Sequence, residues 1–245
     1  MSLHTKPTER SKPLGRFKQA LIASNKLSII AEVKRRSPSR GNLNTALDPA
    51  QLAVAYRDGG AVCLSVLTNQ AMFGGNSNDL RTAATASGLP VLRKDFITTT
   101  QDVYESQEMG ADAILLIVAD LANPAPSDPD LKELHSLALS LGMDVLVEVK
   151  SPDELDLALA ANAEIIGVNQ RAKPKSQAYT MDFQRAQQMA PLLPNNVVKV
   201  AESGIGVAGG TTIDAVRQAG YDAALIGEAL VTADNPVLLL QEFLA

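Results

Sequence analysis

Short apolar runs rich in Val, Ile and Leu recur along the chain, and they alternate with segments whose apolar residues follow a helical period. Short continuous apolar runs of this kind are typical of strands that are buried on both faces of a parallel sheet. The pattern predicts eight strands, at residues 28–34, 62–67, 91–94, 113–118, 145–149, 165–169, 197–201 and 223–226.

The segments between these strands carry signals for the ends of helices. Three of them begin with Asp or Ser followed by Pro, at residues 48–49, 128–129 and 151–152, which is a common way to start a helix. Stop signals follow at Gly59, Gly110, Gly142 and Gly220. One more helical segment, residues 16–22, precedes the first strand.

Eight strand–helix units without a Pro/Gly/Ser linker match a parallel (β/α)8 barrel better than a doubly wound sheet. We therefore predict the α/β class, with a TIM barrel as the one domain of residues 1–245. Strand 1 should begin near residue 28, so that residues 1–27 form a short N-terminal helical extension.

Composition narrows the functional classes. Of the 245 residues, 46% are apolar and only 4% are aromatic, so the core must be aliphatic and a nucleic-acid stacking surface is disfavoured. The net charge of −5 repels polyanions and anionic membranes. The longest apolar run, residues 113–119, is far below the roughly 20 residues of a membrane span. We expect a soluble, cytoplasmic protein that binds neither nucleic acid nor membrane.

Metal and thiol chemistry are not indicated. The single cysteine, Cys63, excludes an internal disulfide framework and a multi-Cys metal site, and its place in an apolar strand predicts a core residue. His4 lies in a predicted tail and His135 on a predicted helix, so neither is expected to be a catalyst. No His/Asp/Glu spacing argues for a metal.

Polar residues gather where the predicted strands end, which is where barrel enzymes carry their chemistry. An ion pair alone, such as Glu32 with Lys34, would have a purely structural explanation. A larger set is different, because burying many ions costs several kcal/mol each unless they pair. The set is better explained by tuned acids and bases: Glu32, Lys34, Lys94, Glu148 and Glu202.

Two glycine-containing turns predict a phosphate site. Ser203-Gly204 follows strand 7 and Gly227-Glu228 follows strand 8, which are positions where many barrels hold phosphate on backbone N–H groups. The loop at residues 37–41 offers hydroxyls and a cation, although such a loop is often only solvated. We therefore expect a phosphorylated small-molecule substrate.

At these residues the chain resembles the indole-3-glycerol-phosphate synthase family of tryptophan biosynthesis, whose members are (β/α)8 barrels. The matching segments run in order along the chain: IAEVKRRSPS at 30–39, LSVLT at 64–68, LRKDFI at 92–97, LVEV at 146–149, IGVN at 166–169 with Arg171, ESGI at 202–205 and LIGE at 225–228.

The resemblance implies a carboxy-lyase that closes the ring of 1-(2-carboxyphenylamino)-1-deoxyribulose 5-phosphate and then releases CO2 and water. It implies no cofactor and no metal. By position, Lys94 would be the general acid for the substrate ketone, and Glu148, Glu32 and Lys34 would manage the other proton transfers. Asn169 would orient a substrate hydroxyl.

The same resemblance assigns the substrate contacts. Lys34 would also face the substrate carboxylate, Glu202 would hold the polar network, and Phe96 with Phe73 would pack the aromatic ring. Arg171 falls among the substrate-binding residues. The phosphate would be bound by Ser37, Ser203, Gly204, Gly227 and the backbone of Glu228.

The chain departs from the family pattern at several places. Only about 27 residues precede strand 1, whereas the family usually has a longer extension whose helices help cover the site, so we expect a reduced cover. Asn69 stands where the family usually has an acidic residue, Lys150 replaces a frequent His, and Gln170 replaces a frequent Asn. The loop at residues 172–180 is a few residues longer than the corresponding loop usually is in the family.

Two alternatives stay open at this point. One is a Schiff-base lyase of the aldolase kind, in which Lys94 or Lys34 is a nucleophile. The other is a non-catalytic barrel that binds a partner. For the leading interpretation we expect a monomer or a weak homodimer, with association to other tryptophan-pathway enzymes.

Overall fold

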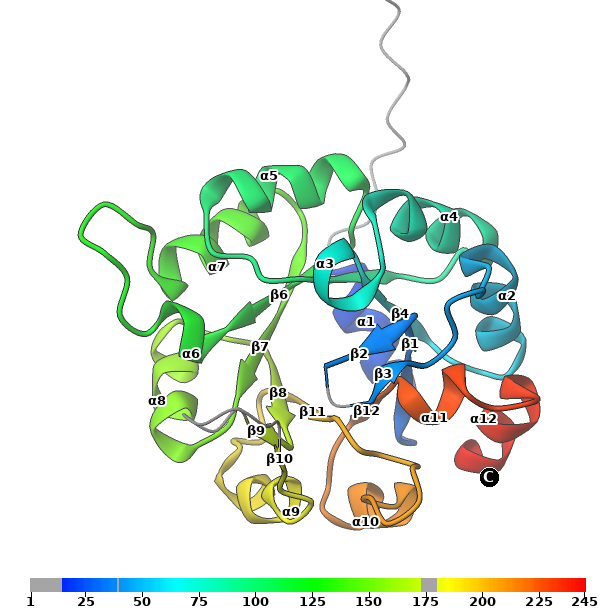
Figure 1. Cartoon of the computed structure of the whole chain (residues 1–245). Helices are drawn as coiled ribbons and strands as arrows, with labels where there is room; N and C mark the ends of the chain where they lie inside the picture. Colours follow the sequence, from blue (N-terminus) through cyan, green and yellow to red (C-terminus); the bar gives the residue numbers. More distant parts are fainter. Residues whose placement is uncertain (1–14, 39, 173–179) are drawn as a thin grey trace, which may run out of the picture.

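The structure, a computed structural model, describes residues 15–38, 40–172 and 180–245. Its centre is a closed barrel of parallel strands surrounded by helices, which confirms the predicted (β/α)8 fold (Figure 1). Around the barrel the strands follow the order β1-β12-β11-β8-β7-β6-β5-β4. Their bounds are β1 Ser28–Val33, β4 Cys63–Leu67, β5 Val91–Lys94, β6 Ala113–Ile117, β7 Asp144–Val149, β8 Ile165–Asn169, β11 Val198–Glu202 and β12 Ala223–Ile226.

The helices begin largely where the sequence signals them. Asp48 and Ser151 cap α2 and α8, each with a proline in the first turn, as predicted. The third predicted start, at residues 128–129, lies two residues before the observed one, because Asp130 rather than Asp128 caps α7. The helices are α1 Arg16–Ile22, α2 Pro49–Asp58, α3 Gln70–Phe73, α4 Ser77–Ser87, α5 Thr100–Met109, α6 Val118–Leu121, α7 Leu131–Ser140, α8 Pro152–Ala160, α9 Arg185–Met189, α10 Ile213–Gln218, α11 Glu228–Val231 and α12 Pro236–Leu244, with a 3-10 turn, η1 Ala190–Leu192.

Alternation along each strand divides the core into two parts. On β1, Ile29 and Ala31 pack outward against the helices, whereas Ile30 packs inward with Leu92, Leu146 and other residues that fill the barrel. The next inward position on β1 is Glu32, which is also buried. The inner column of side chains therefore changes from apolar to charged toward the C-terminal ends of the strands.

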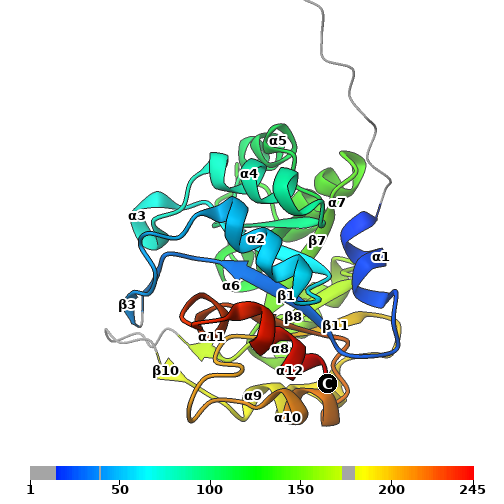
Figure 2. The same cartoon turned by 90° about the vertical axis from the view of Figure 1, so that its right-hand side faces the viewer.

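Helix α1 closes the opposite, N-terminal mouth of the barrel. Phe17 and Leu21 are buried within the inner core, and the backbone N–H of Lys18 donates to Asp144 Oδ2 at 2.9 Å. Arg16 pairs with Asp112 at 3.3 Å, so the helix is held by the beginnings of strands (Figure 2). The predicted helix at 16–22 is confirmed, and it seals the far mouth rather than covering the charged end.

Two small antiparallel hairpins lie near the C-terminal mouth, at the end of the barrel opposite α1 (Figure 2). They are β2 (Arg36–Ser37) with β3 (Gly41–Asn42), and β9 (Arg171–Ala172) with β10 (Thr180–Met181). Among the described residues, the helices are all too short or too polar to cross a bilayer.

Candidate active site

Most of the predicted site residues line one pocket at the C-terminal mouth of the barrel. We call it the mouth pocket, and it is lined by Glu32, Lys34, Leu67, Phe73, Lys94, Asn169, Arg171, Glu202, Ser203, Gly204, Ile205, Val207, Leu225, Gly227 and Glu228. The apolar members Leu67, Ile205, Val207 and Leu225 carried no chemical signal in the sequence. Residues from distant parts of the chain thus meet in one place.

Three predicted residues lie beside this pocket rather than in its lining. Glu148 is buried on β7 and pairs with Lys94, which is itself a lining residue. Phe96 follows β5 and stacks on Phe73. Ser37 is buried in the hairpin after β1, where its hydroxyl accepts a 3.3 Å hydrogen bond from the backbone of Arg40.

Lys94 stands between two carboxylates from other strands. Its Nζ lies 3.4 Å from Glu202 Oε2 and 3.7 Å from Glu148 Oε2. Burial lowers the pKa of Lys94, but the charges of Glu202, Glu148 and Glu32 outweigh it, so the pKa is raised above that of an ordinary lysine. Lys94 is therefore held as a cation with its proton directed into an acidic cluster.

Glu202 is the least compensated carboxyl group of the cluster. It is buried, and neither carboxylate oxygen accepts a well-formed hydrogen bond from the described part of the chain. Burial raises the pKa of Glu202 to about 7, although Lys94 opposes the shift. A carboxyl group that titrates near neutral pH can hold or release a proton during turnover.

The missing side chain of Gly167 lets Glu202 take this position. Gly167 lies on β8, in register with Glu148 on one side and Val200 on the other. A Cβ atom at Gly167 would overlap Glu202 Oε1. The glycine thus allows the Glu202 carboxyl group to extend across β8 toward β7, beside Glu148 and Lys94.

Glu32 and Lys34 form the ion pair that alternation along strand 1 predicts. Burial raises the pKa of Glu32, but the neighbouring ammonium groups of Lys34 and Lys94 outweigh it and lower the pKa below its ordinary value. A Cβ atom at Gly227 would overlap Glu32 Oε1 and crowd Lys34 Nζ. Gly227 therefore makes room for this pair, a role that the sequence did not indicate.

Glu148 contacts a second lysine, Lys150, which stands where the resembled family frequently has a His. Lys150 Nζ lies 2.9 Å from Glu148 Oε1. Burial raises the pKa of Glu148, but Lys94 and Lys150 outweigh it and the pKa is lowered. Lys150 lies two positions after Glu148, just past the end of β7, so a continuation of the strand's alternation could have revealed it.

The predicted phosphate turn after β11 has an unusual backbone. Ser203 and Gly204 both have positive φ, at 70° and 67°. A left-handed serine costs about 1 kcal/mol or more and persists only where its surroundings hold it. Gln170 supplies this support, because its Nε2 donates to Ser203 O at 2.8 Å while Thr211 Oγ1 donates to Gln170 Oε1 at 2.9 Å.

Phe73 and Phe96 stack at the edge of the mouth pocket. Their ring centroids are 6.3 Å apart with an angle of 21° between planes. Phe96 remains 41% exposed, which is unusual for so large an apolar side chain. The two rings come from α3 and from the segment after β5, so they form an aromatic wall across two separate loops.

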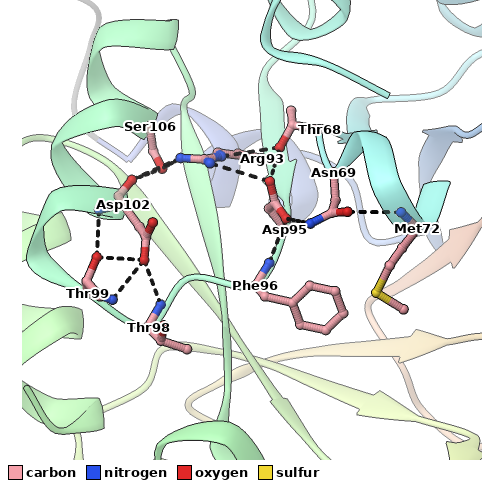
Figure 3. Close-up of polar contacts among 10 residues, drawn as sticks. All are labelled: Thr68, Asn69, Met72, Arg93, Asp95, Phe96, Thr98, Thr99, Asp102 and Ser106. Atoms are coloured by element: carbon pink, nitrogen blue, oxygen red, sulfur yellow. Dashed lines mark hydrogen bonds and ion pairs between the residues drawn. The ribbon is translucent and has the colours of Figure 1, made fainter. Parts of the chain in front are cut away.

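A polar network on the outer side of β5 joins these two loops (Figure 3). Asp95 accepts hydrogen bonds from Thr68 Oγ1 at 2.6 Å, from Asn69 Nδ2 at 3.3 Å and from the backbone of Phe96 at 2.9 Å. Arg93 pairs with Asp95 at 3.4 Å and donates to Ser106 Oγ of α5 at 2.9 Å. These contacts hold the end of β5, which carries Lys94, from the outer side of the barrel.

Asn69 performs two tasks in this network. Its Nδ2 donates to Asp95, and its Oδ1 accepts from the backbone N–H of Met72 at 3.0 Å, which caps α3 (Figure 3). An acidic residue could accept at Met72 but could not donate to the Asp95 carboxylate. The departure at Asn69 therefore creates a direct bond between the loop of Phe73 and the loop of Phe96.

Replacing Asn69 with alanine should weaken substrate binding more than the chemical step. Loss of a helix cap costs about 1 kcal/mol of unfolding free energy, and the freed aromatic wall should raise KM several-fold with little change in kcat. Asn235 caps α12 with the same hydrogen bond, accepting from Leu238 N at 3.1 Å, and lies outside the lining of the mouth pocket. Steady-state kinetics should show a raised KM for Asn69→Ala and an unchanged KM for Asn235→Ala. If the two variants have the same KM, the role of Asn69 is contradicted.

Comparison with known proteins identifies the family of this chain. A family model described as indole-3-glycerol phosphate synthase matches residues 2–243, nearly the whole chain. The chain belongs to this family. The resemblance drawn from the strand-end motifs is thus confirmed.

Curated relatives agree with the family match. The chain is 46% identical over 217 residues to the indole-3-glycerol phosphate synthase of Mycolicibacterium vanbaalenii, covering 89% of this chain and 76% of that protein. It is 48% identical over 210 residues to that of Mycolicibacterium smegmatis, covering 86% of this chain and 74% of that protein.

Solved structures of other enzymes share the fold at low identity. The N-acetylmannosamine-6-phosphate 2-epimerase of Clostridium perfringens aligns with a TM-score of 0.62 and 15% identity over 99% of this chain and 98% of its own. The orotidine 5'-monophosphate decarboxylase of Sulfolobus solfataricus aligns with a TM-score of 0.63 and 10% identity over 89% and 96%. These likenesses concern the barrel alone.

The remaining titratable candidates lie away from the mouth pocket. His135 is buried on α7 and Cys63 lies in the inner core, where burial raises the pKa of its thiol. Within the described ranges, no group of three or more His, Cys, Asp or Glu side chains is arranged to hold a metal ion. His4 and most of the loop at 172–180 lie outside the described residues.

Proposed function

We propose that the chain is an indole-3-glycerol-phosphate synthase, which converts 1-(2-carboxyphenylamino)-1-deoxyribulose 5-phosphate into indole-3-glycerol phosphate with release of CO2 and water. The observation that carries the proposal is the position of Lys94, a cation that is only 14% exposed and lies within 3.7 Å of two carboxylates at the mouth pocket. Family membership supplies the substrate, and this cluster supplies the acid–base chemistry.

Lys94 is the general acid in this proposal. During ring closure the aromatic carbon attacks the ketone, whose oxygen takes up a proton as the C–C bond forms. Lys94 is protonated at neutral pH because Glu202, Glu148 and Glu32 raise its pKa, so it can stabilise the charge that develops on this oxygen. Glu148, which its lowered pKa keeps ionised, would serve as a base in the later proton transfers.

The second proton step is the loss of the hydroxyl formed from the ketone. Decarboxylation gives an intermediate that must lose a proton from the ring-closed skeleton and expel hydroxide as water. Glu32 and Lys34, already paired at the pocket, would act as base and acid here. Asn169 lines the same pocket and would orient the departing hydroxyl.

Cationic and aromatic side chains account for the substrate's other groups. Lys34 and Arg171 line the pocket and would pair with the carboxylate until it leaves as CO2. Arg171 Nε is buried without a hydrogen-bond partner in the described part of the chain, so it is available to a ligand. Phe73 and Phe96 would pack the aromatic ring of the substrate.

The phosphate is assigned to the turns at Ser203-Gly204 and Gly227-Glu228, with Ser37 nearby on the hairpin after β1. These turns line one side of the mouth pocket, and the backbone of Ser203 is held in place by Gln170. Backbone N–H groups suit a dianion because they need no counter-charge of their own.

Inorganic phosphate is therefore expected to compete with the substrate. The apparent KM should rise linearly with millimolar phosphate at constant ionic strength, while kcat stays constant, because both anions would occupy the same turns. Initial-rate kinetics with phosphate against matched chloride would measure this. A phosphate effect no larger than that of chloride would contradict the assignment of these turns.

The proposed function is tested by incubating the purified protein with the deoxyribulose phosphate and following indole absorbance or fluorescence. Turnover is expected without added cofactor and should persist in EDTA. Absence of product from folded protein would contradict the proposed function and would favour the partner-binding barrel.

Cytoplasmic location, a monomeric or weakly dimeric state and association with other tryptophan-pathway enzymes remain predictions of this proposal. Sedimentation of the purified protein at micromolar concentrations would test the oligomeric state.

A further inference from the structure

Lys150 lies behind the catalytic cluster, outside the lining of the mouth pocket. Its ammonium group contacts Glu148 Oε1 at 2.9 Å, while the other oxygen of Glu148 faces Lys94 at 3.7 Å. Glu148 is thus placed between two lysines, one on each carboxylate oxygen. Asn169 also donates toward Glu148.

Glu202 has a poorer set of partners. Lys94 at 3.4 Å is the cation that it pairs with, and in the described ranges its oxygens lack a well-formed hydrogen bond. Glu148 and Glu32 add negative charge nearby, which raises its pKa further. Glu148 pairs with two lysines and Glu202 with one, so of the two carboxyl groups Glu202 is the harder to ionise.

The surroundings of Lys150 keep it charged. Burial alone would lower the pKa of Lys150, but Glu148, Glu154 of α8 and Asp120 of α6 outweigh it. Glu154 Oε2 also accepts the backbone N–H of Lys150 at 2.7 Å, which fixes the end of β7. The ammonium side chain is 27% exposed and does not block the mouth pocket.

We propose that Lys150 is a positioning residue that keeps Glu148 ionised, and that it thereby leaves Glu202 as the carboxyl group that carries the exchangeable proton of the cluster. The two acids then differ in task because Lys150 contacts only one of them. The pKa of about 7 for Glu202 and the lowered pKa of Glu148 agree with this division.

The first test needs no substrate and uses the free protein labelled with 13C at the glutamate carboxyl groups. Glu148→Gln and Glu202→Gln identify the two resonances, which are then followed from about pH 4 to pH 9. In the wild type Glu148 should titrate below Glu202. In Lys150→Met the Glu148 midpoint should rise by about one pH unit or more, the usual effect of losing an adjacent cation.

Matched variants separate charge from packing. Lys150→Arg keeps the cation and should leave the Glu148 midpoint close to the wild-type value, and Lys150→Gln should repeat the shift if Lys150→Met folds poorly. Lys132→Met removes an exposed lysine of α7 and should change neither midpoint. An unmoved Glu148 in both neutral variants, or a wild-type Glu202 that titrates below Glu148, would overturn the proposal.

The kinetic test rests on the proposed function. In Lys150→Met the acid limb of kcat/KM should move up by about one pH unit, so the loss should be about tenfold larger at low pH than at high pH. A purely structural lysine would lower the rate equally at every pH, and that result would overturn the proposal. If the wild type forms no indole product, the proposed function fails while the titration still decides the role of Lys150.

Discussion

Replacing Lys94 with methionine is expected to lower kcat by about 10²- to 10⁴-fold, the range seen when a general acid is removed. The ammonium group stabilises charge that develops on the substrate ketone only during the reaction, so its loss should appear in kcat rather than in binding. KM should change little, because the aromatic wall and the phosphate turns are untouched. Single-turnover kinetics with excess enzyme would separate the chemical step from product release.

The same lysine decides between an acid–base enzyme and a Schiff-base lyase. A nucleophilic lysine must lose its proton, and enzymes achieve this by lowering its pKa. Here Glu202, Glu148 and Glu32 raise the pKa of Lys94, which disfavours that role. Mass spectrometry after borohydride treatment with substrate should show no adduct. An adduct on Lys94 would overturn the acid role, and an undiminished rate in Lys94→Met would exclude both roles.

Replacing Glu148 with glutamine is expected to lower kcat by about 10²-fold or more. The amide keeps the shape of the carboxyl group but cannot accept a proton, and it leaves Lys94 and Lys150 with one fewer counter-ion. Near wild-type kcat would remove Glu148 from the mechanism. Thermal denaturation should accompany the kinetics, because a buried lysine that loses its partner also destabilises the fold.

Glu164→Gln is the matched control for this substitution. Glu164 pairs with Lys18 at 3.0 Å at the α1 end of the barrel, so the change removes a carboxylate from an ion pair without touching the mouth pocket. It should leave kcat within about twofold of the wild type, since exposed ion pairs contribute little.

The barrel strands could be predicted because each is an apolar run bounded by turn residues. The exceptions have tertiary causes. Strand β7 begins at the polar Asp144, one residue before the apolar run, because Asp144 pairs with Ala113 of β6, and its carboxylate accepts the backbone N–H of Lys18 of α1. The hairpins β2–β3 and β9–β10 have two-residue strands, which are too short to show any alternation.

The members of the charged cluster could be predicted, but not their pairing. Alternation places Glu32 beside Lys34 within one strand, whereas the contacts of Lys94 with Glu148 and Glu202 depend on how the barrel closes. Gly167 had no chemical signal in the sequence, yet the space it leaves decides where Glu202 lies. The bond from Asn69 to Asp95 likewise joins two loops that only the folded barrel brings together.

Because helix α1 seals one end of the barrel, the two ends tolerate different substitutions. At the sealed end, Phe17 and Leu21 complete an apolar core that any variant must keep. At the open end, the buried ions lower the stability of the fold but make acid–base catalysis possible, a compromise that is common at catalytic sites. Directed evolution can therefore change the loops around Lys94, because the apolar core at the sealed end offsets the stability that such changes cost. Such a barrel is a favourable starting point for new activities, because a sealed end that is reinforced first allows more destabilising catalytic substitutions at the other.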